Sequence, residues 1–225
     1  MNVLLNPNLA HNTHRFTMAL GHDYELQDCP IARALELVGE RWTLLVIRDC
    51  FLGVSRFNDF LSHLDIPKAI LSARLEKLVA AGILHKTKYA PGQYDYLLTK
   101  RGTSLWPMIY GLASWGDEHH SPSRGRRRIF SHVSCGRVID AHGVCPKCKT
   151  FPQPGDIEIR NGPGAELDLR HDHITKALFL PHRLLVPLIV SAGKTEMRVP
   201  PDRSSIPSQD KERDGRPTSK GPRRI

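Results

Sequence analysis

The sequence predicts a mainly helical domain of the α+β class that carries a small β-hairpin, the arrangement known as a winged helix-turn-helix. Two observations predict it. Short stretches with helical spacing of apolar residues follow one another between residues 29 and 82, and the period then changes to the alternation typical of strands. A longer apolar helix is expected after the strands, so we predict one domain over residues 29–120.

The first three helices are predicted from apolar spacing and from residues that break helices. Residues 1–28 show no firm periodicity and are expected to form an N-terminal arm. Pro30 suits a first helical turn, and Gly39 ends the helix that Pro30 begins. The second helix runs to Gly53 and is apolar on most sides, which predicts that it is buried. Ser55 is placed to cap the third helix.

The stretch from Pro67 to Gly82 predicts the helix around which this domain is organised. Leu71, Leu75 and Leu78 recur at i, i+4 and i+7, so they share one face. Small residues on the outer side leave a slim cylinder that could enter a groove. With the third helix just before it, this stretch predicts a helix-turn-helix.

A β-hairpin is predicted directly behind that helix, and a second long helix behind the hairpin. Residues 83–90 and 94–99 are β-favourable, with a Pro-Gly turn between them. The segment Thr99–His119 carries a broad apolar stripe, and Pro107 is expected to kink it. We interpret this segment as a dimerisation helix, with ordinary packing inside one chain as the alternative.

The 225-residue chain has a net charge of +9 that is unevenly distributed. Residues 1–65 carry 5 basic and 8 acidic side chains, whereas residues 66–101 carry 7 basic and 2 acidic ones. Residues 121–149 hold 7 further basic side chains against Asp140. A polarised basic zone favours a polyanionic partner, and a solvated basic surface is the alternative.

Several classes of protein are not supported by the sequence. A run of about 18 apolar residues is absent, so neither a membrane-spanning helix nor a membrane partner is predicted. The first residues lack the pattern of a secretory signal. We find no glycine-rich phosphate loop, nucleophile elbow or paired-carboxylate motif, and we therefore expect neither an enzyme nor an organic cofactor.

Five cysteines, an odd and clustered set, favour a reducing compartment and thiol or metal chemistry. Cys29 stands at a predicted helix N-terminus, where the helix dipole favours the thiolate, so we consider it as a redox sensor. The alternative for Cys29 is a capping or buried thiol that senses nothing. Cys50 falls in the helix that is expected to be buried and is predicted to be inert.

The remaining cysteines form two spaced pairs with a histidine, His132-x2-Cys135 and Cys145-x2-Cys148. Two ligand pairs separated by a short loop suit a tetrahedral, structural Zn²⁺. His142 is a competing ligand, and unmetallated thiols on a flexible segment are the alternative.

These cysteines lie beyond the helical domain, and the sequence divides that part of the chain into three segments. Residues 121–130 are expected to form a basic linker, and residues 131–165 a small Cys-rich, zinc-ribbon-like extension. Residues 166–225 contain an apolar stretch interrupted by prolines and end in Pro, Ser and charged residues. We predict that they form a largely disordered tail.

Landmark residues occur in every predicted element of the helical domain. They are Cys29-Pro30, Gly39 with Trp42, Arg56-Phe57, Leu71 with Arg74-Leu75 and Leu78, Gly82, Leu98-Thr99 with Gly102, and Trp115. Their order and spacing resemble those of the HxlR-type winged helix-turn-helix regulators. The resemblance implies a bacterial, cytoplasmic, homodimeric transcription regulator that is associated with the nucleoid when bound to double-stranded DNA. It also implies that a cysteine at the place of Cys29 can serve as a redox or electrophile sensor.

The resemblance gives the outward-facing cations a role. The second helix of a helix-turn-helix lies in the major groove, and cations on the wing contact phosphates. A two-fold symmetric dimer would read an inverted repeat with half-sites about one helical turn apart. For Arg74 an internal ion pair is the alternative. The candidate DNA contacts are Arg56, Lys68, Ser72, Arg74, Lys86, Lys88 and Gln93.

Two other functions compete with this interpretation. A protein-interaction module would use the winged helix and the zinc ribbon to bind protein, and the basic zone counts against it. A zinc-dependent enzyme would need an open zinc site and a nearby general base, and the sequence places no such base near the cysteines. A regulator of this kind could respond to redox chemistry or to a small molecule, and the sequence does not choose between them.

Overall fold

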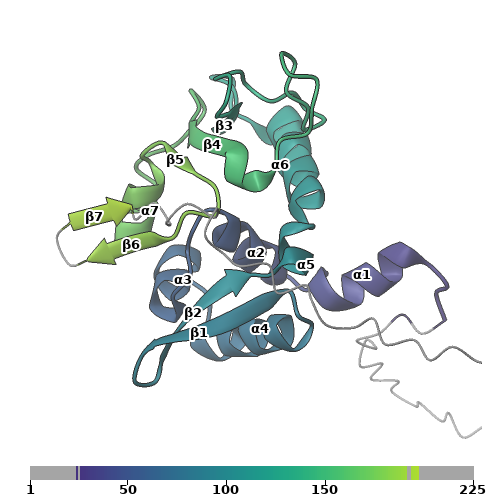
Figure 1. Ribbon diagram of the computed structural model, residues 1–225, viewed down its shortest axis with the longest axis vertical. Coiled ribbons are helices and arrows are strands. Elements are labelled where there is room, and N and C mark those ends of the chain that lie inside the picture. The colour runs from purple at the N-terminus through teal and green to yellow at the C-terminus, as the bar shows by residue number, and fades with distance from the viewer. Residues whose placement is uncertain (1–23, 25, 192–193, 198–225) are drawn as a thin grey trace, which may run out of the picture.

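The computed structural model describes residues 24, 26–191 and 194–197 (Figure 1). The helices are α1 (Pro30–Val38), α2 (Thr43–Phe51), α3 (Phe57–Leu64), α4 (Lys68–Ala80), α5 (Lys100–Thr103), α6 (Trp106–His120) and α7 (His173–Leu178), with a 3₁₀ turn η1 (Pro154–Asp156). The strands are β1 (Leu84–Ala90), β2 (Gln93–Leu98), β3 (Arg128–His132), β4 (Ile157–Asn161), β5 (His182–Arg183), β6 (Leu188–Ser191) and β7 (Lys194–Met197). Within these ranges, every helix is too short or too polar to span a bilayer.

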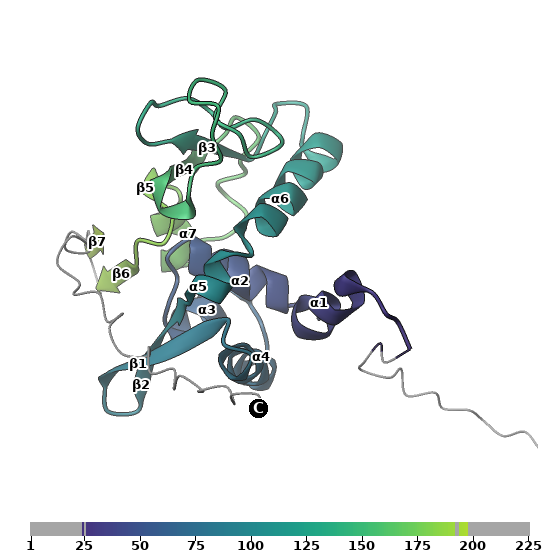
Figure 2. The same cartoon turned by 45° about the vertical axis from the view of Figure 1, so that its right-hand side comes forward.

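The elements gather at two ends of the molecule. Helices α2 to α4 and the hairpin β1–β2 lie at one end, and the sheet β3–β4–β5 lies at the other (Figure 1). Helix α6 runs between the two ends (Figures 1 and 2). The chain is thus a winged helix-turn-helix to which a three-stranded sheet, β3–β4–β5, and a two-stranded sheet, β6–β7, are added.

The predicted helices α1 to α4 are confirmed, and their apolar faces build the core. Leu71, Leu75 and Leu78 of α4 are at most 1% exposed and belong to one cluster with the buried side chains of α2 and α3. The turn between α3 and α4 passes through Asp65 at a φ of 54°. After α4, Gly82 adopts a φ of 66°, a conformation that glycine tolerates without strain.

The wing is the antiparallel hairpin β1–β2, with Gly92 in its turn at a φ of 70°. The expected role of Ser55 is wrong, because α3 begins after Arg56 and has no side-chain capping bond. The Ser55 hydroxyl instead donates to Asp95 Oδ1 at 2.8 Å, and the Ser55 carbonyl accepts from the Tyr96 N–H at 2.8 Å. These two bonds join the beginning of α3 to the wing.

The single kinked helix expected over Thr99–His119 is two helices in the structure. Thr99 does act as a cap, since its hydroxyl accepts from the Gly102 N–H at 3.1 Å. Helix α5 then ends at Thr103, and α6 begins with Pro107 in its first turn. A proline in a first turn removes no helical hydrogen bond, so Pro107 begins a helix instead of kinking one.

Two expectations for the C-terminal half need correction. Strand β3 begins at Arg128, inside the segment 121–130 that was expected to be a linker, and it pairs with β4. Residues 173–188 are ordered and not part of a disordered tail, since they form α7, β5 and the start of β6. The expected tail beyond residue 197 lies outside the described residues.

Residues 173–188 fold because their apolar side chains enter the core of the helical domain. Ile174, Leu178 and Leu184 are at most 2% exposed. Backbone N–H groups of Leu185 and Leu188 donate to the Phe51 and Gly53 carbonyls, each at 2.8 Å. The two prolines in this stretch interrupt any helical or strand period, which explains why its sequence pattern gave no signal.

Replacement of Ile174 by alanine is expected to destabilise the whole domain. Ile174 is fully buried beside α3, and an Ile→Ala change in a core costs about 2–5 kcal/mol of unfolding free energy. Urea unfolding followed by circular dichroism measures the loss. Leu169→Ala is the matched control, because Leu169 is 74% exposed and should change stability by about 0.5 kcal/mol or less. Equal effects of the two substitutions would contradict the docking of α7.

Candidate nucleic-acid interface and metal centre

Helix α4 presents a slim outer face to solvent. Lys68, Ala69 and Ala73 are exposed on it, while the three leucines of the opposite face are buried. Ser72 is half-buried, and its hydroxyl donates to Glu76 Oε1 at 3.2 Å. The narrow outer surface could approach the floor of a groove, with Lys68 at the leading, N-terminal end.

Arg74 forms the internal ion pair that the sequence left open as an alternative. Its guanidinium contacts Glu40, and Lys77 Nζ lies 2.9 Å from the other oxygen of the same carboxylate. The Arg74 side chain is only 19% exposed. Arg74 therefore fixes α4 against the connection between α1 and α2, and sequence reasoning missed Glu40 because no periodicity marks it.

Aromatic rings on the wing hold two of the candidate cations. The Arg56 guanidinium lies 4.3 Å from the centre of the Tyr89 ring, and Arg56 Nε is 3.5 Å from Asp95 Oδ1. Lys86 Nζ lies 5.0 Å from the centre of the Tyr94 ring. Distances of this size are typical of cation–π contacts, which restrict the positions of both cations. Asp95 also pairs with Arg56, whereas Lys86 has no acidic partner among the described residues.

The other wing candidates, Lys88 and Gln93, are exposed on β1 and β2 beside the turn. The hairpin projects at the same end of the molecule as α4, away from β3 and β4 (Figure 2). The structure therefore brings Lys68, Lys86, Lys88 and Gln93 to one end of the folded molecule, with Arg56 at the base of the wing. Arg74 is the one candidate of the set that is held inside.

Helices α6 and α1 each expose two or more large apolar side chains. Leu112 and Trp115 of α6 are 51% and 58% exposed, and Ile31 and Leu35 of α1 are also exposed. Residues on an α-helix turn by about 100° each, so Leu112 and Trp115 lie on the side of α6 that faces away from the buried Tyr110. This outer side of α6 has no covering element among the described residues.

The predicted ligand pairs meet in space. One donor atom from each of His132, Cys135, Cys145 and Cys148 lies within 4.8 Å of the others. The Cys135 and Cys145 sulfur atoms are 3.4 Å apart. His142 is exposed and does not join the group. The four side chains form a cluster that could hold a metal ion.

Local turns and a hydroxyl orient the cluster. His132 ends β3, and the tight turn after it contains Gly136 at a φ of 67°. The Ser134 hydroxyl lies 2.8 Å from His132 Nε2, which leaves Nδ1 directed at Cys135 Sγ, 3.7 Å away. A second hydrogen bond that fixes the ring of a ligating histidine is usual in zinc sites, so the donor set fits a metal with sulfur and nitrogen ligands.

The thiols of the cluster differ in acidity. Burial would raise the pKa of Cys145, but the Cys148 backbone N–H, His132 and Cys135 outweigh burial and lower this pKa to about 6. Hydrogen bonding to Cys135, followed by burial, raises the pKa of Cys148 to about 11. Cys145 is therefore largely a thiolate at neutral pH, whereas Cys148 needs a cation to deprotonate.

Cys29 stands at the N-cap of α1, as the sequence predicts, and is partly exposed. The backbone N–H groups of Ala32 and Ile31 lower the pKa of its thiol. Burial, reinforced by Asp49, raises the pKa of Cys50 well above the ordinary value. Of the two cysteines in the helical domain, Cys29 is therefore expected to be reactive and Cys50 to be inert.

Cys29 is expected to be alkylated by iodoacetamide at least about tenfold faster than Cys50 at neutral pH, because only a thiolate attacks and only Cys29 is accessible. Peptide mass spectrometry of the folded protein measures both rates in one sample. Unfolding in urea is the control and should make the two rates similar. Equal rates in the folded protein would contradict the assignment.

A buried charged cluster escaped the sequence analysis. The Asp49 carboxylate is fully buried, with Arg48 Nη2 at 2.6 Å and His63 Nδ1 at 2.7 Å. Burial alone would raise the pKa of Asp49, but Arg48 and His63 outweigh it and hold that pKa below its usual value. The sequence feature that could have indicated this cluster is Asp49 itself, an acidic residue on an otherwise apolar face of α2.

Comparison with known proteins identifies the family. A family model described as HxlR-like helix-turn-helix matches residues 37–124. The uncharacterized HTH-type transcriptional regulator Rv3095 of Mycobacterium tuberculosis is 37% identical over 152 residues, which cover 67% of this chain and 95% of Rv3095. The chain belongs to the HxlR-like helix-turn-helix family. The HTH-type transcriptional regulator YdeP of Bacillus subtilis is 30% identical over 106 residues, covering 44% of this HxlR-like chain and 83% of YdeP.

Among solved structures, the redox regulator HypR in its oxidized form is 26% identical, with a TM-score of 0.38 over 42% of this chain and 100% of HypR. A likeness at this TM-score supports no conclusion by itself. The HxlR-like match runs from the end of α1 to the end of α6, so α4 and the wing lie inside it. The cysteine cluster and α7 lie beyond it.

Proposed function

We propose that this HxlR-like protein is a sequence-specific transcription regulator that binds an inverted-repeat DNA operator as a homodimer. The observation that carries the proposal is the pairing of a slim, solvent-facing α4 with a cationic wing at the same end of a chain of this family. Such a protein would act in the bacterial cytoplasm, on the nucleoid.

Helix α4 is the proposed reader of the major groove. Lys68, at its N-terminal end, can reach a phosphate or the acceptor edge of a guanine. Ser72 can exchange its bond to Glu76 for a bond to a base or phosphate. Because Arg74 is paired with Glu40, few side chains of α4 are free to read bases. Much of the affinity must come from the wing and from the second copy.

The wing is proposed to contact phosphates. Lys86 and Lys88 are exposed cations on β1, and Gln93 adds a neutral donor beside the turn. Arg56 can reach a phosphate from the base of the wing while its ring contact with Tyr89 orients it. Such contacts add affinity and fix the register but carry little sequence information.

Quantitative binding tests the proposal. Fluorescence anisotropy with DNA from upstream of the protein's own gene is expected to give an affinity that falls steeply with salt, and a scrambled duplex should bind more weakly. Equal affinity for both duplexes at every salt concentration would favour a protein-interaction module or nonspecific binding instead.

The exposed outer side of α6 is the proposed dimer interface. Leu112 and Trp115 supply the apolar centre that a stable interface needs. An inverted-repeat operator with half-sites about one helical turn apart requires that pairing through α6 hold the two copies of α4 at that spacing.

Trp115→Glu is expected to weaken dimerisation at least about tenfold, because a charge would replace a large apolar contact in the interface. Analytical ultracentrifugation measures the change. Leu169→Glu, at an exposed leucine far from α6 in sequence, is the control and should leave the dimer intact. A wild-type protein that is monomeric at micromolar concentration would contradict the homodimer.

We also propose that His132, Cys135, Cys145 and Cys148 hold a structural Zn²⁺. Their proximity, the orientation of His132 by Ser134 and the low pKa of Cys145 support this assignment. Four protein ligands leave no open coordination position, so the metal would stabilise the loops around it and would not bind a substrate. Cys29 remains the proposed site of redox sensing.

A further inference from the structure

A cavity lies where the helical domain meets the C-terminal sheet. Its volume is about 470 Å³, and side chains from α2, α3, α6, β3 and β4 line it. Cavities of this size commonly hold small organic molecules. Neither α4, the wing nor the cysteine cluster contributes to its walls.

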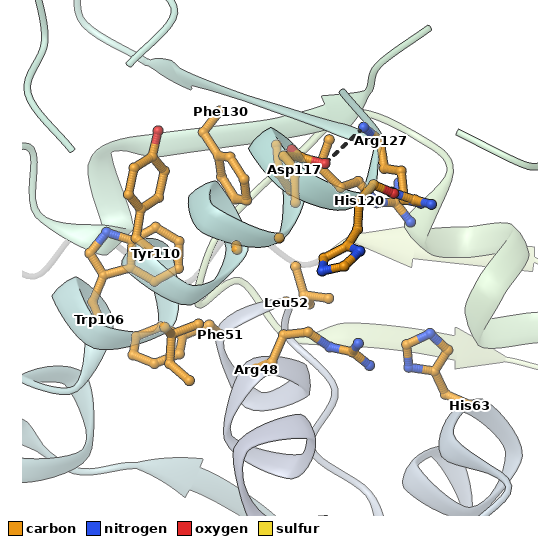
Figure 3. A pocket seen from close by; sticks show the side chains of 15 residues that line it. Arg48, Phe51, Leu52, His63, Trp106, Tyr110, Asp117, His120, Arg127 and Phe130 are labelled. Atoms are coloured by element: carbon orange, nitrogen blue, oxygen red, sulfur yellow. Dashed lines mark hydrogen bonds between the residues drawn. The ribbon is translucent and has the colours of Figure 1, made fainter. Parts of the chain in front are cut away.

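The cavity has an aromatic side and a cationic side (Figure 3). Phe51, Trp106, Tyr110 and Phe130 form the aromatic side, with ring centres 5.1 Å apart for Phe51 and Trp106 and 5.3 Å apart for Tyr110 and Phe130. Mutual packing of this kind holds the rings in place. An apolar molecule would therefore meet a rigid wall.

The cationic side carries Arg48, Arg127 and Arg128, together with His63 and His120. Figure 3 shows Arg48, His63, His120 and Arg127 on the side away from Trp106 and Tyr110. The Arg48 charge is compensated by buried Asp49. Within the part of the chain that the structure describes, the Arg127 and Arg128 guanidinium groups form no ion pair.

Within the described residues, the guanidinium groups of Arg127 and Arg128 bond only to neutral oxygens. Arg127 Nη1 donates to the His120 carbonyl at 2.7 Å, and Arg128 Nη1 donates to the Leu178 carbonyl at 3.1 Å and to the Asn161 side chain. Burial, followed by the nearby Arg48 charge, lowers the pKa of Arg128. Arg128 is half-buried, and a buried cation without a counter-ion is costly, so a bound anion would relieve that cost. Arg127 is exposed and would add a second contact to the anion.

One acid also lines the cavity and opposes an anion. The Asp117 carboxylate accepts from the Ser121 hydroxyl at 2.9 Å and from the Arg127 backbone N–H at 3.2 Å. These bonds occupy the same oxygen, Oδ1, and the arginines still outnumber Asp117 and Asp49 together. The lining is therefore net cationic beside an apolar wall.

We propose that this cavity binds a small organic carboxylate with an aromatic body. The aromatic part of the ligand would pack against the rings of the aromatic side. Its carboxylate would pair with the guanidinium groups of Arg127 and Arg128. Because α2 and α3 share the cavity with β3 and β4, the ligand would change how firmly the helix-turn-helix is joined to the sheet. That regulatory consequence rests on the proposed function, whereas binding of the carboxylate does not.

Isothermal titration calorimetry of the full chain with 2-naphthoate tests the site. Micromolar to submillimolar binding is expected, and the uncharged analogue 2-naphthamide should bind at least about tenfold more weakly because it cannot pair with the arginines. Arg127→Ala should weaken 2-naphthoate at least about tenfold. Arg126→Ala is the matched control, since Arg126 is adjacent and exposed but does not line the cavity, and its effect should be less than about twofold.

A second variant distinguishes loss of binding from loss of folding. Ala113 of α6 lines the cavity and is exposed, so Ala113→Phe should fill the space and abolish binding while the circular dichroism spectrum stays unchanged. Absence of heat with 2-naphthoate up to millimolar concentration would overturn the proposal, as would equal loss in Arg127→Ala and Arg126→Ala. If 2-naphthoate binds but leaves operator affinity unchanged, the regulatory consequence is wrong and the site remains. Failure of the unliganded protein to bind DNA would instead count against the proposed function.

Discussion

Replacing Lys86 and Lys88 together by glutamate is expected to weaken operator binding by about 100-fold or more at moderate salt. Both side chains are exposed cations on β1, and neither forms an ion pair within the described residues. Loss of two phosphate contacts should also reduce the slope of log affinity against log salt by about 2, because fewer counterions are released. Anisotropy titrations at several salt concentrations measure both quantities.

The control for this experiment has the same change in net charge at another place. Arg160→Glu with Lys176→Glu alters two exposed cations on β4 and α7, outside the wing and α4. It should lower affinity much less than the wing variant. If the two double variants lose the same affinity, the effect comes from overall charge and the wing does not contact DNA.

Cys145→Ser is expected to lower the zinc content from about one ion per chain to nearly none. Cys145 is fully buried, and its pKa of about 6 makes it a thiolate at neutral pH, so a serine hydroxyl there removes an anionic ligand. Native and denaturing mass spectrometry of the same sample measures the bound metal. Loss of the metal should also increase hydrogen exchange in residues 132–150.

Cys29→Ser is the matched control for the metal experiment, because Cys29 lies in the helical domain and outside the cluster. This variant should keep its zinc. A wild-type protein without zinc, or a Cys145→Ser variant with unchanged zinc, would contradict the metal assignment. Cys29→Ser should also bind DNA normally and lose any response to oxidant.

Local patterns were sufficient to predict helices α1 to α4 and the wing. The spacing of Leu71, Leu75 and Leu78 fixes the buried face of α4, and the Pro-Gly turn marks the wing, because both signals act over a few residues. The paired cysteine spacing likewise predicted a cluster that the structure assembles. Each of these features depends on residues that are close together in the sequence.

Features that depend on distant residues could not be predicted. Whether Arg74 faces solvent or Glu40 depends on how the connection between α1 and α2 lies against α4, and the sequence left both open. Residues 173–188 have no clear period, and they fold only because the core around Phe51 accepts them. Arg48 and Phe130 line the same cavity although they are 82 positions apart in the sequence. No local sequence motif spans such a separation.

Footprinting on the DNA upstream of the protein's own gene tests the central claim most directly. The account predicts a protected inverted repeat whose half-sites are centred about one helical turn apart, as two copies of α4 in successive major grooves require. Protection should disappear as the salt concentration rises, because phosphate contacts supply much of the affinity. Absence of protection at low salt, on this segment and on every neighbouring promoter, would contradict a DNA-binding regulator.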